Sequence, residues 1–154
     1  MKREVKELFA KAERTKEQLD EMMAELSDSL IKLLNSEISV EEHKAKSKAV
    51  QNVQKAWKQQ MDTALKTLLL ARREAASKWG ARPYDQYIVK GDIRGRVSSH
   101  LTVGDAIKAA RIDRKRWRRL GEGTHSDVLV YQIDLDGELH LVDEHEHEYE
   151  EQKE

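Results

Sequence analysis

The chain has 154 residues, of which 37% are charged, 38% hydrophobic and 5% aromatic, with a formal net charge of -1 and no Cys. So few aromatic side chains among so many charges exclude one large compact core, and the lack of Cys excludes disulfide scaffolds, thiolate catalysis and thiolate metal sites. No apolar stretch is long enough for a membrane span or a signal peptide, so we expect a soluble, cytoplasmic protein.

The first predicted element is a long amphipathic helix from Arg3 to Leu34, where apolar residues recur every three or four positions. Ser39 and Glu42 follow with the spacing of a capping box, in which each side chain satisfies a backbone N–H of a new helix. A second helix is therefore predicted to begin near Ser39.

The second helix carries an apolar stripe as far as Trp79. Gly80 then predicts a left-handed cap, and Pro83 prevents the helix from resuming. Because the connection between the two helices is short, they are expected to lie antiparallel. Residues 1–80 are thus predicted to form a helical hairpin of coiled-coil type.

Leucines are dense at 30–34 and 65–70, beyond what contact between two helices requires. Burying them favours a homodimer or a higher oligomer, although packing on the following domain would also cover them.

Residues 81–142 are predicted to form a small basic α/β domain. Residues 84–90 have strand propensity, and Gly91-Asp92 suggests a turn into a second short strand. Ser98-Ser99 or Thr102 could cap a short helix over 103–110, and a tight turn at 111–113 would lead into another helix over 114–120.

A β-hairpin is the clearest local signal, because residues 128–142 alternate between apolar and polar on both sides of Asp136-Gly137. A three-residue loop, 135–137, pairs Ile133 with Leu139 and Tyr131 with Leu141, which keeps apolar side chains on one face. Residues 143–154 are strongly acidic and lack apolar periodicity, so a disordered tail is expected there.

Charge is segregated along the second half of the chain. Residues 80–122 carry 11 Lys or Arg against 5 Asp or Glu, whereas residues 123–154 carry 1 against 11. Residues 111–119 contain six cations, which is too many for the nearby acidic residues to pair. Unpaired guanidinium groups favour phosphate as a partner. The predicted nucleic-acid-binding residues are these six and two arginines of the preceding strand region: Arg111, Arg114, Lys115, Arg116, Arg118, Arg119, Arg94 and Arg96.

The segment 102–120, TVGDAIKAARIDRKRWRRL, resembles the helix-turn-helix of bacterial and phage DNA-binding proteins, and the following β-hairpin resembles the wing of a winged helix. The resemblance implies that Ala106, Ala110, Ile112, Trp117 and Leu120 pack the two helices together. It also implies that the cations of residues 114–119 lie on a recognition helix.

Signatures of catalysis are missing: the sequence has no phosphate loop, no GxGxxG, no HExxH and no GxSxG. A nuclease or phosphotransferase site stays conceivable where Asp92, Asp105 and the run Ser98-Ser99-His100 lie near Arg94 and Arg96. We nevertheless predict no enzyme and no cofactor, because these motifs are missing. We also predict no metal site, because the histidines at 140, 145 and 147 lack a fixed geometry.

These patterns predict an α+β protein: a long antiparallel helical hairpin at 1–80, a small α/β domain at 81–142 with a helix-turn-helix-like pair and a β-hairpin, and an acidic tail at 143–154. The function they favour is DNA binding by a dimeric regulator or nucleoid-type organiser, with RNA as an open possibility. The alternative is a phage-type protein-interaction factor, an inhibitor or adaptor that uses the hairpin and the acidic tail.

Overall fold

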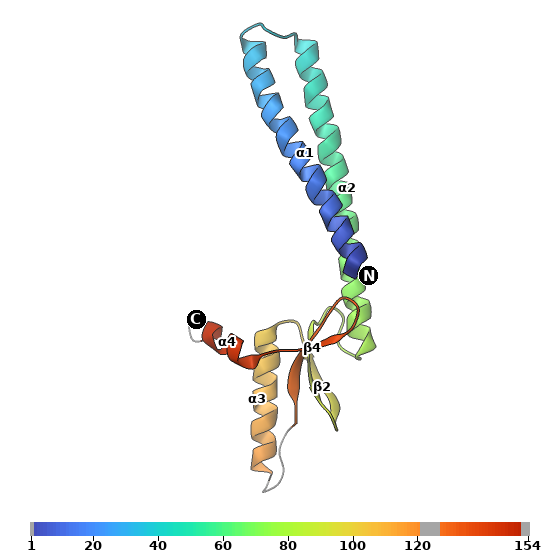
Figure 1. The fold of residues 1–154 in the computed structure, drawn as a ribbon, viewed down its shortest axis with the longest axis vertical. Coiled ribbons are helices and arrows are strands. Elements are labelled where there is room, and N and C mark those ends of the chain that lie inside the picture. The colour runs from blue at the N-terminus through green and yellow to red at the C-terminus, as the bar shows by residue number, and fades with distance from the viewer. Residues whose placement is uncertain (1, 121–126, 152–154) are drawn as a thin grey trace. The chain divides into compact units, whose positions relative to one another are not determined.

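The computed structural model describes residues 2–120 and 127–151. Its elements are, in chain order, α1 Lys2–Leu34, α2 Val40–Lys78, β1 Tyr87–Gly91, β2 Gly95–His100, α3 Val103–Arg119, β3 Leu129–Ile133, β4 Leu139–Leu141 and α4 Glu144–Glu151 (Figure 1). The chain divides into two compact units, residues 2–67, here the hairpin unit, and residues from 68 on, here the sheet unit. The predicted α+β class is confirmed.

The hairpin unit consists of α1 and the larger part of α2, which run antiparallel (Figure 1). The buried apolar residues of α1 are Val5, Ala12 and Leu19, which recur every seven residues as in a coiled coil. A polar pair lies near the tip, where the buried Ser29 Oγ is 3.0 Å from His43 Nδ1. Such a pair favours one register of the two helices, since any shift would leave Ser29 buried without a partner.

The predicted ends of α2 are confirmed. Glu42 N donates to Ser39 Oγ over 3.2 Å, and the helix begins at Val40. At its other end Gly80 has a φ of 63°. The N–H of Ala81 donates to the carbonyl of Ala76 over 3.0 Å, which closes the helix with the left-handed cap that the glycine predicts.

The four strands form one antiparallel sheet in the order β2-β1-β3-β4. The register predicted for the last two is confirmed, with Ile133 opposite Leu139 and Tyr131 opposite Leu141. The loop is also as predicted, because Asp134 N donates to Glu138 O over 2.9 Å and Gly137 has a φ of 81°. Gly137 lies tightly against α2, since a Cβ there would be 2.8 Å from Lys78 Cδ.

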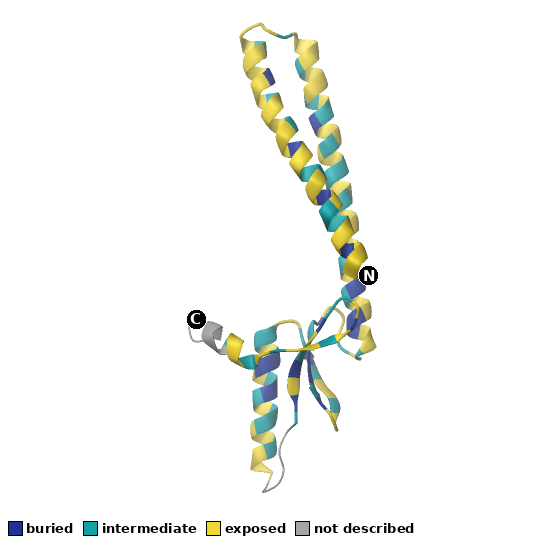
Figure 2. Cartoon of the chain, viewed as in Figure 1, coloured by how far each residue is buried: buried dark blue, intermediate teal, exposed yellow. Residues whose placement is uncertain are grey.

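The two faces of the sheet have different cores. On one face α3 packs on the sheet, in a cluster of Val89, Ala106, Ile107, Ala110, Val128 and Val130. On the other face the end of α2 packs through Ala75 and Trp79 onto Ile88 and Ile133, and Trp79 Nε1 donates to Gly137 O over 2.7 Å. Buried residues accordingly line the inner side of α3 and the central strands (Figure 2).

One predicted turn is wrong: α3 is a single helix through residues 111–113, so the helix-turn-helix-like pair is not formed. No glycine or proline interrupts this stretch, and a turn there would have required Arg111 to leave the helical region at a cost of roughly 1 kcal/mol. The predicted cap is correct, since Thr102 Oγ1 accepts from Asp105 N over 3.3 Å.

The beginning of the acidic segment also differs from the expectation of an unstructured tail. Residues Glu144–Glu151 form α4, and Asp143 Oδ1 accepts the N–H of His145 over 3.0 Å at its start. Carboxylates in the first turn of a helix interact favourably with its N-terminal dipole, which explains why so charged a segment forms one here.

Candidate nucleic-acid interface

The candidate interface lies on the second half of α3. Helical spacing places Lys108, Ile112, Lys115 and Arg119 on the side opposite the buried Ala106, Ile107 and Ala110. All four are exposed. Lys108 was not predicted as a binding residue, because it lies outside the dense run of cations. Its seven-residue separation from Lys115, which places both on one face of a helix, is the signal that identifies it.

Arg114, one of the predicted binding residues, lies instead on the inner side of α3. Its guanidinium bonds both carboxylate oxygens of Glu144, over 2.9 and 2.8 Å, and donates to the carbonyl of Val128 over 2.9 Å. Only 24% of the Arg114 side chain is exposed. Arg114 therefore fastens α3 to the start of β3 and to α4, and its charge is already balanced.

Arg94 is likewise engaged within the protein. It forms an ion pair with Asp113, and its guanidinium carbon lies 4.7 Å from the centre of the Trp117 ring. Both contacts join the turn between β1 and β2 to the second half of α3. Arg94, which the sequence predicts together with the α3 cations as a nucleic-acid-binding residue, lies against α3 and positions the turn.

Asp127 holds the same turn from the side of β3. Its Oδ2 accepts the N–H of Ile93 over 3.3 Å. This hydrogen bond lowers the pKa of Asp127, with smaller contributions from other backbone N–H groups and from the charge of Arg94. Gly91 is needed here, because a Cβ would overlap the Asp127 carboxylate.

The remaining predicted cations are divided between two places. Lys115, Arg116, Arg118 and Arg119 are exposed on α3, and Arg111 is half-buried there. Arg96 lies opposite Lys90 in the register of the sheet, on the face away from α3, and its guanidinium is beside Gly80. The structure therefore places Arg94 against α3, on the side of Asp113 and Trp117, and leaves Arg96 apart.

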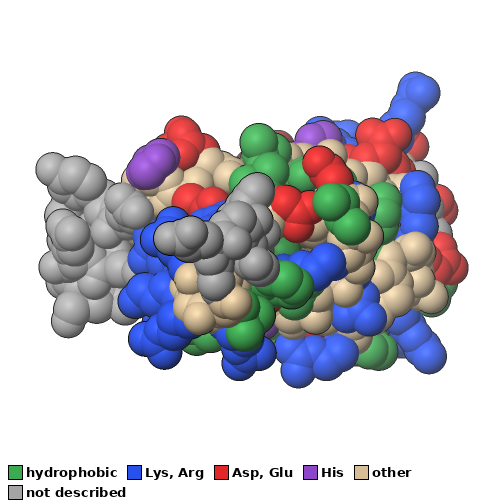
Figure 3. All heavy atoms as spheres, turned by 90° about the horizontal axis from the view of Figure 1, so that it is seen from below, with side chains coloured by type: hydrophobic (Ala, Val, Ile, Leu, Met, Phe, Trp, Pro, Cys, Tyr) green, Lys and Arg blue, Asp and Glu red, His purple; other side chains and the backbone are tan. Residues whose placement is uncertain are grey.

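We call the cluster of Arg94, Lys115, Arg116, Arg118 and Arg119 the basic end. Figure 1 shows that the β1–β2 turn and the last residues of α3 lie at the same end of the sheet unit. Viewed from that end, Lys and Arg side chains gather along one side (Figure 3). Among the side chains that the structure describes, those of residues 2–120 and 127–147, no carboxylate pairs with the four α3 cations of this cluster.

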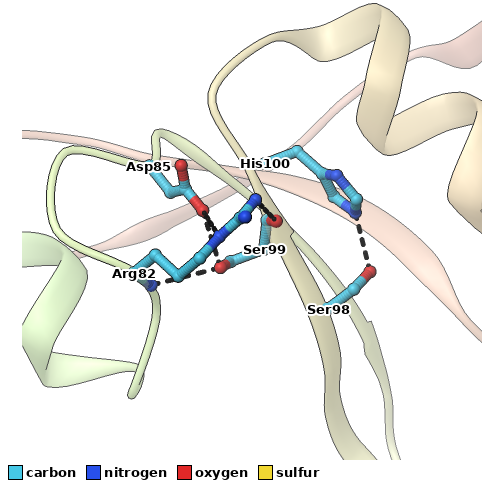
Figure 4. A network of polar contacts seen from close by, with 5 residues as sticks. All are labelled: Arg82, Asp85, Ser98, Ser99 and His100. Carbon is cyan, nitrogen blue, oxygen red and sulfur yellow. Dashed lines mark hydrogen bonds and ion pairs between the residues drawn. The ribbon is translucent and has the colours of Figure 1, made fainter.

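A second polar cluster joins β2 to the segment that precedes β1 (Figure 4). The buried Asp85 accepts from Ser99 Oγ over 2.7 Å and from Arg82 Nε over 3.0 Å, and Arg82 Nη2 donates to Ser99 O over 2.9 Å. Each group satisfies another, which is the arrangement that a buried polar network requires. The cluster fastens residues 82–85 to the edge strand.

The neighbouring Ser98 and His100 lie close to this network. Ser98 Oγ is 2.8 Å from His100 Nε2, and burial, followed by the charge of Arg82, lowers the pKa of His100. Asp92, which the sequence placed with them, lies in the β1–β2 turn at the far end of β2. The catalytic grouping considered from the sequence is therefore divided between the two ends of the strand.

Three potential metal ligands meet at the β3–β4 loop, where atoms of Asp134, Glu138 and His140 lie within 4.8 Å of one another. The Asp134 carboxylate accepts two backbone N–H groups and lies 2.7 Å from His140 Nε2, which lowers its pKa. These bonds hold the loop in its turn conformation.

Comparison with known proteins finds no family model, no curated protein and no solved structure that matches this chain. Among the helices that the structure describes, none combines the length and the hydrophobicity needed to cross a membrane.

Proposed function

We propose that the sheet unit binds double-stranded DNA through the basic end, without catalysing a reaction on it. The observation that carries this proposal is a set of exposed cations on α3, namely Lys115, Arg116, Arg118 and Arg119, with which no described carboxylate forms an ion pair. A protein gains little stability from such a cluster, since like charges on neighbouring helical turns repel one another. A phosphate backbone balances this charge and releases its own counterions.

The rigidity of the scaffold supports the same proposal. The inner side of α3 is fixed by the buried Ala106, Ile107 and Ala110, and Arg114 ties its second half to the chain before β3. The exposed cations therefore project from an element that loses little freedom on binding. Lys108 and Arg119 are 11 residues apart, roughly 16 Å along the axis, so the helix can contact several successive phosphates.

The experiment is fluorescence anisotropy of a labelled random duplex over a salt series. The variant replaces Lys115, Arg118 and Arg119 with Ala, and its matched control replaces the exposed Lys44, Lys46 and Lys48 of α2 with Ala. Both remove three positive charges. We expect micromolar or tighter binding by the wild type, and a salt slope smaller by about 2 to 3 in the α3 variant only.

Equal losses in the two variants would show that net charge, and not this surface, governs binding. Absence of wild-type binding at low salt would overturn the proposal. Single-stranded DNA and RNA of the same length, measured beside the duplex, test which nucleic acid is preferred.

We further propose that the hairpin unit joins two copies. Leu30, Ile31, Leu34 and Val40 are between 48% and 75% exposed at its tip. Apolar side chains grouped in this way are typical of an association surface. Replacing Leu30, Ile31 and Leu34 with Ser should convert a dimer into a monomer in sedimentation analysis, and a wild type that sediments as a monomer would contradict this.

The same exposed tip favours a second candidate function, which is that of a protein-interaction factor. In that case the tip would hold a different protein, and the basic end would bind no duplex. A monomeric wild type that fails to bind DNA would favour this candidate over the first.

A further inference from the structure

The turn between β1 and β2 presents an apolar side chain to solvent. Ile93 is 93% exposed, more than any other large hydrophobic residue in the described part of the chain. Turns are usually formed by Gly, Asn, Asp, Pro or Ser, whose conformations and side chains suit them. An isoleucine side chain favours no special backbone conformation at such a position and forms no hydrogen bond there.

The backbone that carries Ile93 is held on both sides. Its own N–H donates to Asp127, and Gly91 permits the close approach of that carboxylate. The following residue, Arg94, is bound by Asp113 and packs on Trp117. The Ile93 side chain therefore projects into solvent from a turn that is anchored to both α3 and the start of β3.

The surroundings of this isoleucine are cationic. Arg94 is its neighbour in sequence, and the contact of Arg94 with Trp117 places the turn next to the exposed Arg116 and Arg118 of the basic end. A protein partner that buried Ile93 would have to supply carboxylates around an apolar pocket. In DNA, phosphates surround stacked bases, so the same pairing of charge and apolar surface is found along the whole duplex.

We propose that Ile93 is an apolar wedge that enters the minor groove and partly unstacks a base step of the DNA bound at the basic end. This inference rests on the proposed function and names the contact that deforms the duplex. Partial unstacking costs a few kcal/mol, which the contacts made by the bent DNA offset. The adjacent cations would hold the phosphates on each side of the opened step.

The test uses full-length protein and a duplex that carries donor and acceptor dyes at its ends, with 2-aminopurine at a central TA step. The wild type should raise both energy transfer and 2-aminopurine fluorescence. Ile93→Ser should bind with the same salt slope while both signals stay at the values of free DNA. The matched control is Leu101→Ser, which alters a leucine that is 55% exposed between β2 and α3, away from the β1–β2 turn, and should leave both signals unchanged from the wild type.

The possible failures are distinguishable. If the wild type binds the duplex and neither signal changes, or if Ile93→Ser produces the wild-type signals, the wedge is refuted and the DNA-binding proposal stands. If the wild type does not bind the duplex at all, both are refuted. Because Ile93 is almost fully exposed, its substitution should leave the thermal unfolding midpoint unchanged, and this measurement verifies that the variant is folded.

Discussion

The two faces of α3 use similar residues for different purposes. On the inner face Ile107 is 1% exposed, and Arg114 is bonded to Glu144 and to a backbone carbonyl. On the outer side Ile112 is 60% exposed, and Arg119 is open to solvent. An isoleucine or an arginine on this helix therefore contributes to stability only where the sheet or α4 lies against it. The outer side is available for a partner because the fold does not need it.

The sharpest test of this contrast makes the same change on both faces. Ile107→Ala should destabilise the protein by about 2 to 5 kcal/mol, since it removes apolar contacts and leaves a cavity between α3 and the sheet. Ile112→Ala should change the free energy of unfolding by less than about 0.5 kcal/mol. Urea unfolding followed by circular dichroism measures both. Similar losses at the two positions would mean that the outer side of α3 is covered in solution.

The two arginines provide the second test. Arg114→Ala should cost about 1 to 3 kcal/mol, because it removes the guanidinium bonds to the carbonyl of Val128 and the carboxylate of Glu144 in a partly buried place. Arg119→Ala should leave stability within about 0.5 kcal/mol of the wild type and weaken DNA binding instead. Chemical unfolding and anisotropy on the same two variants separate these roles. A stable Arg114→Ala protein would return this residue to the set of candidate DNA contacts.

The parts that sequence reasoning predicted correctly depend on local signals. The ends of α2 follow from Ser39 and Gly80, and the register of β3 and β4 follows from apolar alternation around Asp136-Gly137. Each signal and its consequence lie within a few residues. The turn predicted at 111–113 is wrong because that prediction followed the helix-turn-helix resemblance. The absence of glycine and proline, which is a local signal for a continuous helix, received less weight.

The candidate site was harder to predict because it depends on residues far apart in the chain. Arg114 meets a carboxylate 30 positions later, and Arg94 meets one 19 positions later. A count of cations cannot separate those that the fold has paired from those that remain exposed. The exposure of Ile93 was missed for the same reason, since it follows from the contacts that Asp127 and Trp117 make with the turn.

The start of α3 offers a smaller test of the inner face. Thr102→Ala should destabilise the protein by roughly 1 kcal/mol, because the N–H of Asp105 loses its side-chain acceptor at the first turn. Thr102→Ser is the matched control and should restore most of the loss, since Ser also places a hydroxyl at this position. Thermal unfolding at one pH compares the three proteins. An unaffected Thr102→Ala variant would show that packing alone fixes the first turn.

The smallest expected effect concerns pH and depends on His100, which lies beside the start of α3. Burial and the charge of Arg82 lower its pKa, against the opposing influence of Asp85 and Asp105. The unfolded chain binds the proton near pH 6.5 and the folded chain only at lower pH. Between these values the unfolded state holds more protons, so stability falls as the pH decreases through 6.5 and levels off below the folded pKa. Unfolding of wild type and His100→Gln at a series of pH values isolates this contribution. The wild type should lose stability relative to the variant as the pH falls from 7.5 to 5. Parallel stability curves would show that folding does not lower the pKa of His100.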